Sequence, residues 1–247
     1  MFTNHDTFLP LEELGKVSRP YLPTHAFGGP FINESHRFYS TCPSKDGMLI
    51  DVGVVGWLLR ADALKLYELA YFAPGDILEI GCSHGLSTSI IARAVIDSGL
   101  PRRIDTIDLD PTCVTRTRDL LKLMKYDRLV DMHCGDGATV CRELAGAGRT
   151  FAFVFIDHHH SYRPVFDVCV ELASLTAPGA LCLFHDYNDP RNADPANEDF
   201  GVYQAVQEGL PAADFEFHGI FGCTGLYRRR GTDPIGSLPD ALRDHQR

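Results

Sequence analysis

Apolar and polar positions along the chain form blocks that predict strands and helices in alternation. Short apolar runs of the β type each precede a segment in which apolar residues recur every three or four positions. This order is typical of a parallel sheet with helices on both faces. The predicted strands cover residues 76–80, 104–109, 130–134, 151–156 and 180–184 with two more in 215–229, and the predicted helices cover residues 61–70, 87–97, 115–125, 138–145 and 201–210.

The same pattern divides the chain into three parts. Residues 1–44 are rich in Pro, Gly, His and aromatic residues and lack periodicity, so we expect an irregular arm that covers a site or a partner subunit. Residues 45–230 predict one α/β domain with a Rossmann-like, doubly wound, mostly parallel sheet and an antiparallel C-terminal edge strand. Residues 231–247 predict a mobile tail.

Composition and charge exclude several classes of protein. The formal net charge is −10, whereas binding to nucleic acid relies on clustered Lys and Arg. The eight cysteines form no C-x-x-C pair, which favours reduced thiols. The first residues lack the pattern of a secretory signal, and the longest apolar stretch, residues 49–59, is too short to span a bilayer. We therefore expect a cytoplasmic protein without a nucleic-acid or membrane partner.

The first candidate site is the segment DILEIGCSHGLS, residues 76–87, in which a strand runs through a glycine loop into a helix. Gly81 and Gly85 permit positive φ or close approach of a ligand, although a tight turn alone would also use them. Ser83 stands where the dinucleotide fingerprint G-x-G-x-x-G has its second glycine, which disfavours a pyrophosphate and hence a nicotinamide oxidoreductase.

Two acidic motifs accompany the glycine loop: IDTIDLD at residues 104–110 and CGDG at residues 134–137. In this set the chain resembles the class I S-adenosylmethionine-dependent methyltransferases, whose first motif looks like E-x-G-x-x-x-G. The resemblance implies S-adenosylmethionine (SAM) as cofactor, with Asp108 on the ribose hydroxyls and Asp136 near the adenine. The expected cofactor-binding residues are Glu79, Gly81, Ser83, Gly85, Ser87, Asp108, Asp136 and Asp157.

The second candidate site lies where two further strands end. The apolar strand in FAFVFIDHHHSYRPV ends at Asp157, which three histidines follow, and the strand in ALCLFHDYNDP ends at His185 and Asp186. Buried parallel strands deliver their C-terminal residues to the ligand crevice. Carboxylate and imidazole groups together can hold Mg²⁺ or Mn²⁺.

This second site resembles that of the metal-dependent small-molecule O-methyltransferases, in the branch of the macrocin-type sugar methyltransferases and the cephalosporin hydroxylase-like proteins. The resemblance implies Asp157, His185 and Asp186 as metal ligands, although His185 stands where some relatives have a carboxylate. It also implies His160 as the general base. The expected reaction is methylation of a hydroxyl on a small molecule, a sugar or a natural-product intermediate, by an enzyme that could be a homo-oligomer.

Other interpretations of these residues stay open. The three histidines fit an exposed turn, Asp157 fits a cap for a helix near Tyr162, and Asp186 fits the start of a turn. The acidic loop at residues 187–200 is a candidate substrate lid or a simple crossover. A catalytically inert methyltransferase-like binding protein would keep the glycine loop and Asp108, and a hydrolytic metal site would use only the second set of residues.

Overall fold

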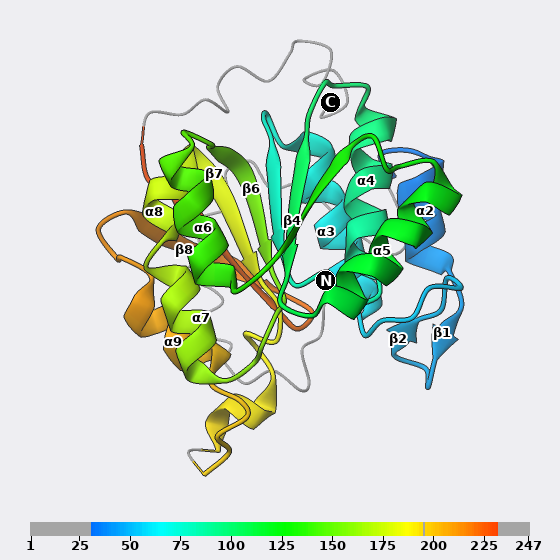
Figure 1. Cartoon of the computed structure of the whole chain (residues 1–247). Coiled ribbons are helices and arrows are strands. Elements are labelled where there is room, and N and C mark those ends of the chain that lie inside the picture. The colour runs from blue at the N-terminus through cyan, green and yellow to red at the C-terminus, as the bar shows by residue number, and fades with distance from the viewer. Residues whose placement is uncertain (1–30, 195, 232–247) are drawn as a thin grey trace.

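The computed structural model describes residues 31–194 and 196–231, whose centre is a seven-stranded sheet (Figure 1). The strand order is β5-β4-β3-β6-β7-β9-β8. Pairing is parallel from β5 to β7 and antiparallel from β7 through β9 to β8. The strands are β3 Ile77–Ile80, β4 Ile104–Asp108, β5 Val130–Cys134, β6 Phe151–Ile156, β7 Thr176–Phe184, β8 Phe215–Phe221 and β9 Thr224–Arg229.

The topology reverses direction next to β3. From β3 the chain passes outward to β4 and β5, and it then returns to the other side of β3 to form β6 and β7. In open α/β sheets ligands bind beyond the carboxyl ends of the strands at such a switch point. Ligand-binding residues are therefore expected directly after β3, β4 and β6.

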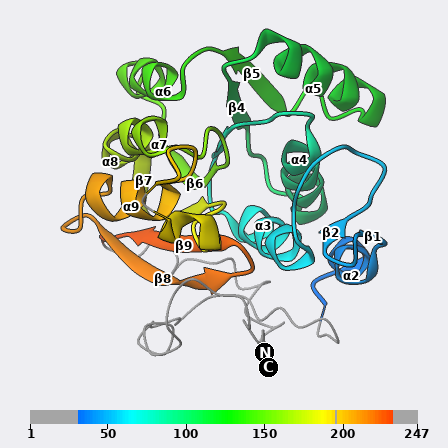
Figure 2. The same ribbon diagram turned by 90° about the horizontal axis from the view of Figure 1, so that it is seen from below.

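Helices cover both faces of the sheet (Figure 2). Successive residues of β6 point to opposite faces, so Phe153 and Phe155 belong to one core while Val154 and Ile156 belong to the other. The first core includes α3 Arg60–Phe72, α4 Leu86–Ser98 and α5 Pro111–Met124, and the second includes α6 Gly137–Gly146, α7 Tyr162–Cys169, α8 Leu172–Leu175 and α9 Val202–Gly209.

The predicted alternation of strands and helices and the antiparallel edge are confirmed, with two differences in detail. Helix α5 begins at Pro111 rather than Thr115, because the Asp110 side chain accepts a hydrogen bond from Thr112 N and proline suits the first turn. Helix α3 buries every residue from Ala61 to Ala70 instead of one face. It does so because α2, α4 and the sheet surround it.

The prediction of an irregular segment up to residue 44 is wrong for residues 34–41. These residues form helix α2, Glu34–Thr41, which Asn33 caps through a 2.9 Å hydrogen bond from His36 N. A tertiary contact with α3 also stabilises this helix, since buried His36 Nε2 lies 3.0 Å from Glu68 Oε1. A small hairpin follows, β1 Ser44–Lys45 with β2 Leu49–Ile50. The rest of the predicted arm, residues 1–30, and the tail at 232–247 lie outside the described residues.

Several expectations from composition can be compared with the structure. All eight cysteines are free thiols. The basic run at residues 228–230 ends strand β9, where Arg228 and Arg230 pair with Glu216 at 3.3 and 3.1 Å. No helix among the described residues has the length and apolar character needed to cross a membrane.

Candidate active site

A cavity of about 850 Å³ opens at the carboxyl ends of the strands. Its wall is built from the loops after β3, β6 and β7, the segment before α3, and the β8–β9 turn. Seven of the residues predicted from the sequence line it together: Gly81, Ser83, Ser87, Asp157, His160, His185 and Asp186.

Gly81 directly follows β3 and packs against the residues that follow the neighbouring strand β6. It has φ +98°, and a Cβ atom placed on it would lie 2.5 Å from the carbonyl carbon of Asp157 and 2.8 Å from Cα of His158. Both of these atoms belong to the backbone, which cannot turn aside as a flexible side chain can. Glycine at this position therefore lets the ends of β3 and β6 approach, and it brings the glycine loop beside Asp157.

Asp108, at the end of β4, anchors the glycine loop. Its Oδ2 accepts a 2.8 Å hydrogen bond from Ser83 N, and its Oδ1 accepts one of 2.9 Å from Asp110 N. Ser83 has φ +46°, which is uncommon for a residue with a side chain. The carboxylate thus holds the loop in a strained shape and keeps further lone pairs for the ribose hydroxyls predicted to bind there.

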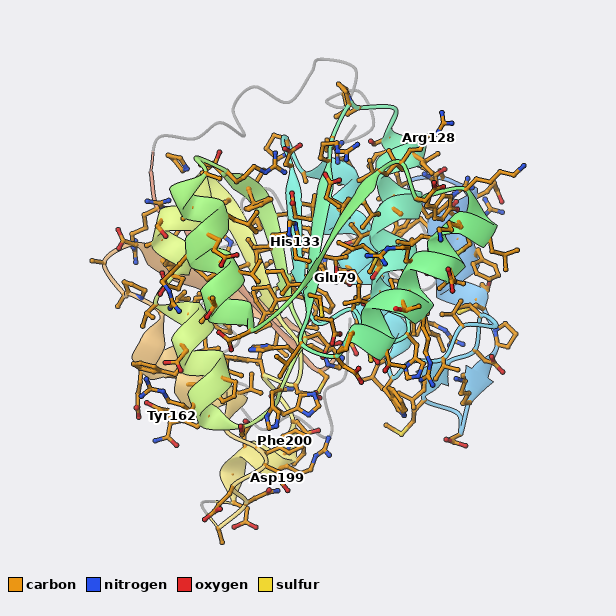
Figure 3. All side chains as sticks on the ribbon, viewed as in Figure 1. Glu79, Arg128, His133, Tyr162, Asp199 and Phe200 are labelled. Carbon is orange, nitrogen blue, oxygen red and sulfur yellow. The ribbon has the colours of Figure 1, made fainter. Side chains whose placement is uncertain are left out.

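Glu79 lies in the middle of the sheet, on the strand that leads into the loop (Figure 3). It is fully buried, and its Oε2 accepts hydrogen bonds from Thr88 Oγ1 at 2.5 Å and Thr106 Oγ1 at 2.6 Å. Burial raises the pKa of this carboxyl to about 7, against the lowering effect of the hydroxyls around it.

Four of the predicted cofactor residues do not line the cavity: Glu79 and Asp108, described above, and Gly85 and Asp136. Gly85 has φ +87° and begins α4, where a Cβ atom would lie 2.9 Å from the side chain of Leu120. Asp136 caps α6 by accepting 2.9 and 2.8 Å hydrogen bonds from the backbone and hydroxyl of Thr139. Next to Asp108, the side chain of Leu109 is 70 % exposed. An exposed apolar side chain beside a carboxylate suits the base and ribose of a nucleoside.

Asp157, His160 and Asp186 form a group whose potential ligand atoms all lie within 4.8 Å of one another. His160 Nε2 lies 3.0 Å from Asp186 Oδ2 and 3.9 Å from Asp157 Oδ1. Asp186 has φ +53°, the second strained residue of the cavity wall. Helix α7 begins at Tyr162 with Ser161 as its N-cap, so the alternative of Asp157 as the cap of this helix is wrong.

His185 stands behind this group and is 7 % exposed. Its Nδ1 makes no hydrogen bond, although it lies 3.3 Å from Asp157 Oδ1 and 3.2 Å from Asp186 Oδ2. Burial lowers the pKa of His185, but the negative charges of Asp157 and Asp186 outweigh burial and hold that pKa well above its ordinary value. Two carboxylates and an imidazole nitrogen that faces both of them are a set of donors that fits a divalent cation, which would take the place of the Nδ1 proton.

Asp62 is a residue of the cavity wall that the sequence interpretation missed. It is buried at the start of α3, and its Oδ2 lies 3.3 Å from His185 Nε2. Its two oxygens also accept hydrogen bonds from Leu59 N at 2.9 Å and Cys223 N at 2.8 Å. The sequence carried no signal for this contact, because Asp62 and His185 are 123 positions apart.

The segment after β7 closes one side of the cavity. It contains the short 3₁₀ helix η1, Pro190–Ala193, and extends below the carboxyl ends of the strands (Figure 1). Phe200, which Figure 3 shows at this lower edge, packs its ring 5.0 Å from that of His160 and 3.7 Å from the guanidinium of Arg191. The predicted loop at 187–200 therefore lies against the predicted base.

The opposite wall of the cavity is apolar, and the sequence pattern did not predict it. Met48, Val55 and Trp57 all line it while remaining 62, 53 and 62 % exposed. Between them Gly56 packs tightly on the start of α4, since a Cβ atom there would lie 2.7 Å from Cβ of Leu86. Exposed apolar side chains gathered at a cavity mark a surface that binds a ligand.

The fold and this arrangement can now be compared with known proteins. Residues 78–187 match a family model described as a methyltransferase domain. The matched segment begins within β3 and ends just after β7, so it contains both sets of predicted site residues. Over this segment the chain is similar to methyltransferase domains. This match agrees with the resemblance drawn from the glycine loop and its acidic motifs. No curated protein matches the chain.

Solved structures share the fold of this chain. The O-methyltransferase TomG from Streptomyces achromogenes, involved in tomaymycin synthesis and determined in complex with SAM, is 23 % identical with a TM-score of 0.60, and the alignment covers 70 % of this chain and 82 % of that one. An O-methyltransferase from Bacillus cereus in complex with SAH is 19 % identical with a TM-score of 0.56, covering 67 % and 79 %. At these identities the likeness establishes the fold.

Proposed function

We propose that this chain is a SAM-dependent enzyme that methylates a hydroxyl group of a small molecule with the help of a divalent cation. One observation carries the proposal. The glycine loop that Asp108 anchors opens into the same cavity as Asp157, His160 and Asp186. A methyl donor held by the loop would therefore lie beside groups that can bind and deprotonate an acceptor.

The cofactor assignment rests on the residues around the loop. Gly81, Ser83 and Ser87 line the cavity, and Asp108 stands beside an exposed apolar residue at the next strand end. When bound, SAM supplies an activated methyl group for in-line displacement by an oxygen nucleophile. The two structural neighbours described above contain SAM and SAH, which supports the same cofactor class here.

His160 is the residue we assign as general base. Its ring is 40 % exposed, and Asp186 at 3.0 Å can orient it. An alcohol must lose a proton as it is methylated, and an imidazole at the cavity mouth can accept that proton and release it to water. The cation would then be held by Asp157, Asp186 and Nδ1 of His185. Its charge would lower the pKa of a coordinated hydroxyl.

The acceptor we propose is a small molecule with an apolar face. A cavity of about 850 Å³ that also has to admit part of the cofactor leaves room for a ligand of modest size. The apolar wall of Met48, Val55 and Trp57 would contact such a face and turn the hydroxyl toward His160. The net charge of −10 supports an acceptor other than nucleic acid.

A methyl-transfer assay with radiolabelled SAM and a panel of hydroxylated small molecules, with and without Mn²⁺, tests this function. We expect product with at least one acceptor, stimulation by the metal, and loss of turnover in His160→Ala with SAM and Mn²⁺ affinities unchanged. Loss of Mn²⁺ affinity in His160→Ala would make His160 a ligand instead. Tight SAM binding without turnover on any acceptor would favour the inert binding protein.

A further inference from the structure

The role of His185 depends on which of its ring nitrogens carries the proton. Nε2 is hydrogen-bonded to the Oδ2 atom of Asp62 at 3.3 Å, whereas Nδ1 makes no hydrogen bond and faces Asp157 and Asp186. A carboxylate can only accept a hydrogen bond from an imidazole. The contact with Asp62 therefore keeps a proton on Nε2, so Nδ1, which faces the two cavity carboxylates, is the nitrogen that can exchange its proton for a cation.

Asp62 is itself held in place. Its side chain is 1 % exposed, and each of its oxygens accepts a backbone hydrogen bond, Oδ2 from Leu59 N at 2.9 Å and Oδ1 from Cys223 N at 2.8 Å. These two donors lie on different elements, the start of α3 and the β8–β9 turn. A carboxylate fixed from two sides can fix the imidazole it contacts.

We propose that Asp62 is a positioning residue that makes His185 a metal ligand through Nδ1. This inference rests on the metal-assisted function proposed above and adds a residue outside the segment that matches the methyltransferase family model. Histidine ligands commonly donate their second ring N–H to a carboxylate, which fixes the tautomer and raises the basicity of the ligating nitrogen. Here Asp62 supplies that carboxylate from α3.

The pairing also gives a physical reason for a histidine at the end of β7. A third carboxylate at position 185 would meet Asp62 as well as Asp157 and Asp186, and would add a buried negative charge to a crowded group. An imidazole separates these carboxylates, since Nε2 faces Asp62 and Nδ1 faces the cavity pair. Asp62 and His185 therefore act as one unit.

The test is a double-mutant cycle on metal affinity with full-length protein. Binding of Mn²⁺ is measured from the free-ion electron paramagnetic resonance signal for the wild type, Asp62→Asn, His185→Ala and the double variant. The carboxamide that replaces the Asp62 carboxylate can donate to Nε2 and so favours the tautomer with the proton on Nδ1. We expect Asp62→Asn to weaken Mn²⁺ binding about 10- to 100-fold in the wild-type background, and to have no further effect once His185 is alanine.

Thermal unfolding distinguishes the positioning role of Asp62 from its structural role. The substitution leaves Leu59 N or Cys223 N without a full acceptor, so Tm should fall by a similar amount in both backgrounds. The Asn33→Ala variant, which removes the cap of α2 without touching His185, should lower Tm and leave Mn²⁺ affinity unchanged. Binding of SAM, measured by calorimetry, should be retained in all of these variants.

Three results would overturn the inference, and they are distinguishable. Equal weakening by Asp62→Asn in both backgrounds, or none in the wild type, would contradict the role of Asp62 while leaving the metal site in place. A wild-type protein that binds SAM but no Mn²⁺ would contradict the metal-assisted function and the role of Asp62 together.

Discussion

The close approach of two strands at Gly81 gives the sharpest prediction for stability and cofactor binding. In Gly81→Ala the new methyl group would lie 2.5 Å from the carbonyl carbon of Asp157, so the ends of β3 and β6 must separate. Gly99→Ala is a matched control. Gly99 also has a positive φ, +67°, but nothing lies within 4 Å of the position its Cβ would take.

Comparison of the two variants separates two contributions to the loss of stability. A side chain in the left-handed region costs about 1–2 kcal/mol, and both variants include this term. Forcing extra volume against packed atoms costs about 1–3 kcal/mol more, and only Gly81→Ala includes it. We therefore expect a loss of about 1–2 kcal/mol in Gly99→Ala and about 2–5 kcal/mol in Gly81→Ala, against a total stability of about 5–15 kcal/mol.

Urea unfolding measures this difference, since the midpoint should fall further in Gly81→Ala while the slope stays constant. Titration with SAM adds a functional measurement. Separation of the strand ends displaces the loop, so Gly81→Ala should weaken SAM binding while Gly99→Ala should not. Equal loss of stability in the two variants, with SAM affinity intact in both, would refute the claim that close approach requires glycine at position 81.

Three further predictions concern single side chains. Burial raises the pKa of Glu79 from 4.5 to about 7, so the folded state holds the extra proton. Stability should therefore fall as pH rises through this window, by on the order of 3 kcal/mol, and Glu79→Gln should flatten that part of a plot of the free energy of unfolding against pH; an unchanged slope would contradict the assignment. Asp157→Asn should abolish Mn²⁺ binding by calorimetry while the protein stays folded by circular dichroism, and unaltered binding would remove Asp157 from the metal site. Trp57→Ala should raise KM for an acceptor at least tenfold with kcat and SAM affinity little changed, whereas an unchanged KM would exclude this wall from acceptor binding.

The sequence predicted the sheet and its helices well because buried parallel strands give unbroken apolar runs. Strand β6 is the clearest case, since all six residues from Phe151 to Ile156 are buried. Helix α2 was missed because its eight residues are polar on average and are held by contacts such as that between His36 and Glu68. A local pattern cannot reveal a helix that tertiary contacts stabilise.

The candidate site shows the same limit. Asp157, His160 and Asp186 could be expected to converge, because they follow strands that the fold places side by side. Asp62 and Trp57 lie before the first parallel strand, in segments whose pattern indicates only a helix or a loop. Their place in the cavity depends on how α3 and the segment before it fold back over the strand ends, which no spacing in the sequence records.

In the proposed function, the glycine loop and Asp108 bind SAM together. Calorimetric titration of the wild type, Asp108→Ala and Asp110→Ala with SAM measures this binding. Asp110→Ala is the control, because Asp110 only caps α5 and should affect Tm alone. We predict saturable micromolar binding to the wild type and to Asp110→Ala, and at least tenfold weaker binding to Asp108→Ala. No binding to the wild type, or equal affinity in all three proteins, would contradict the account.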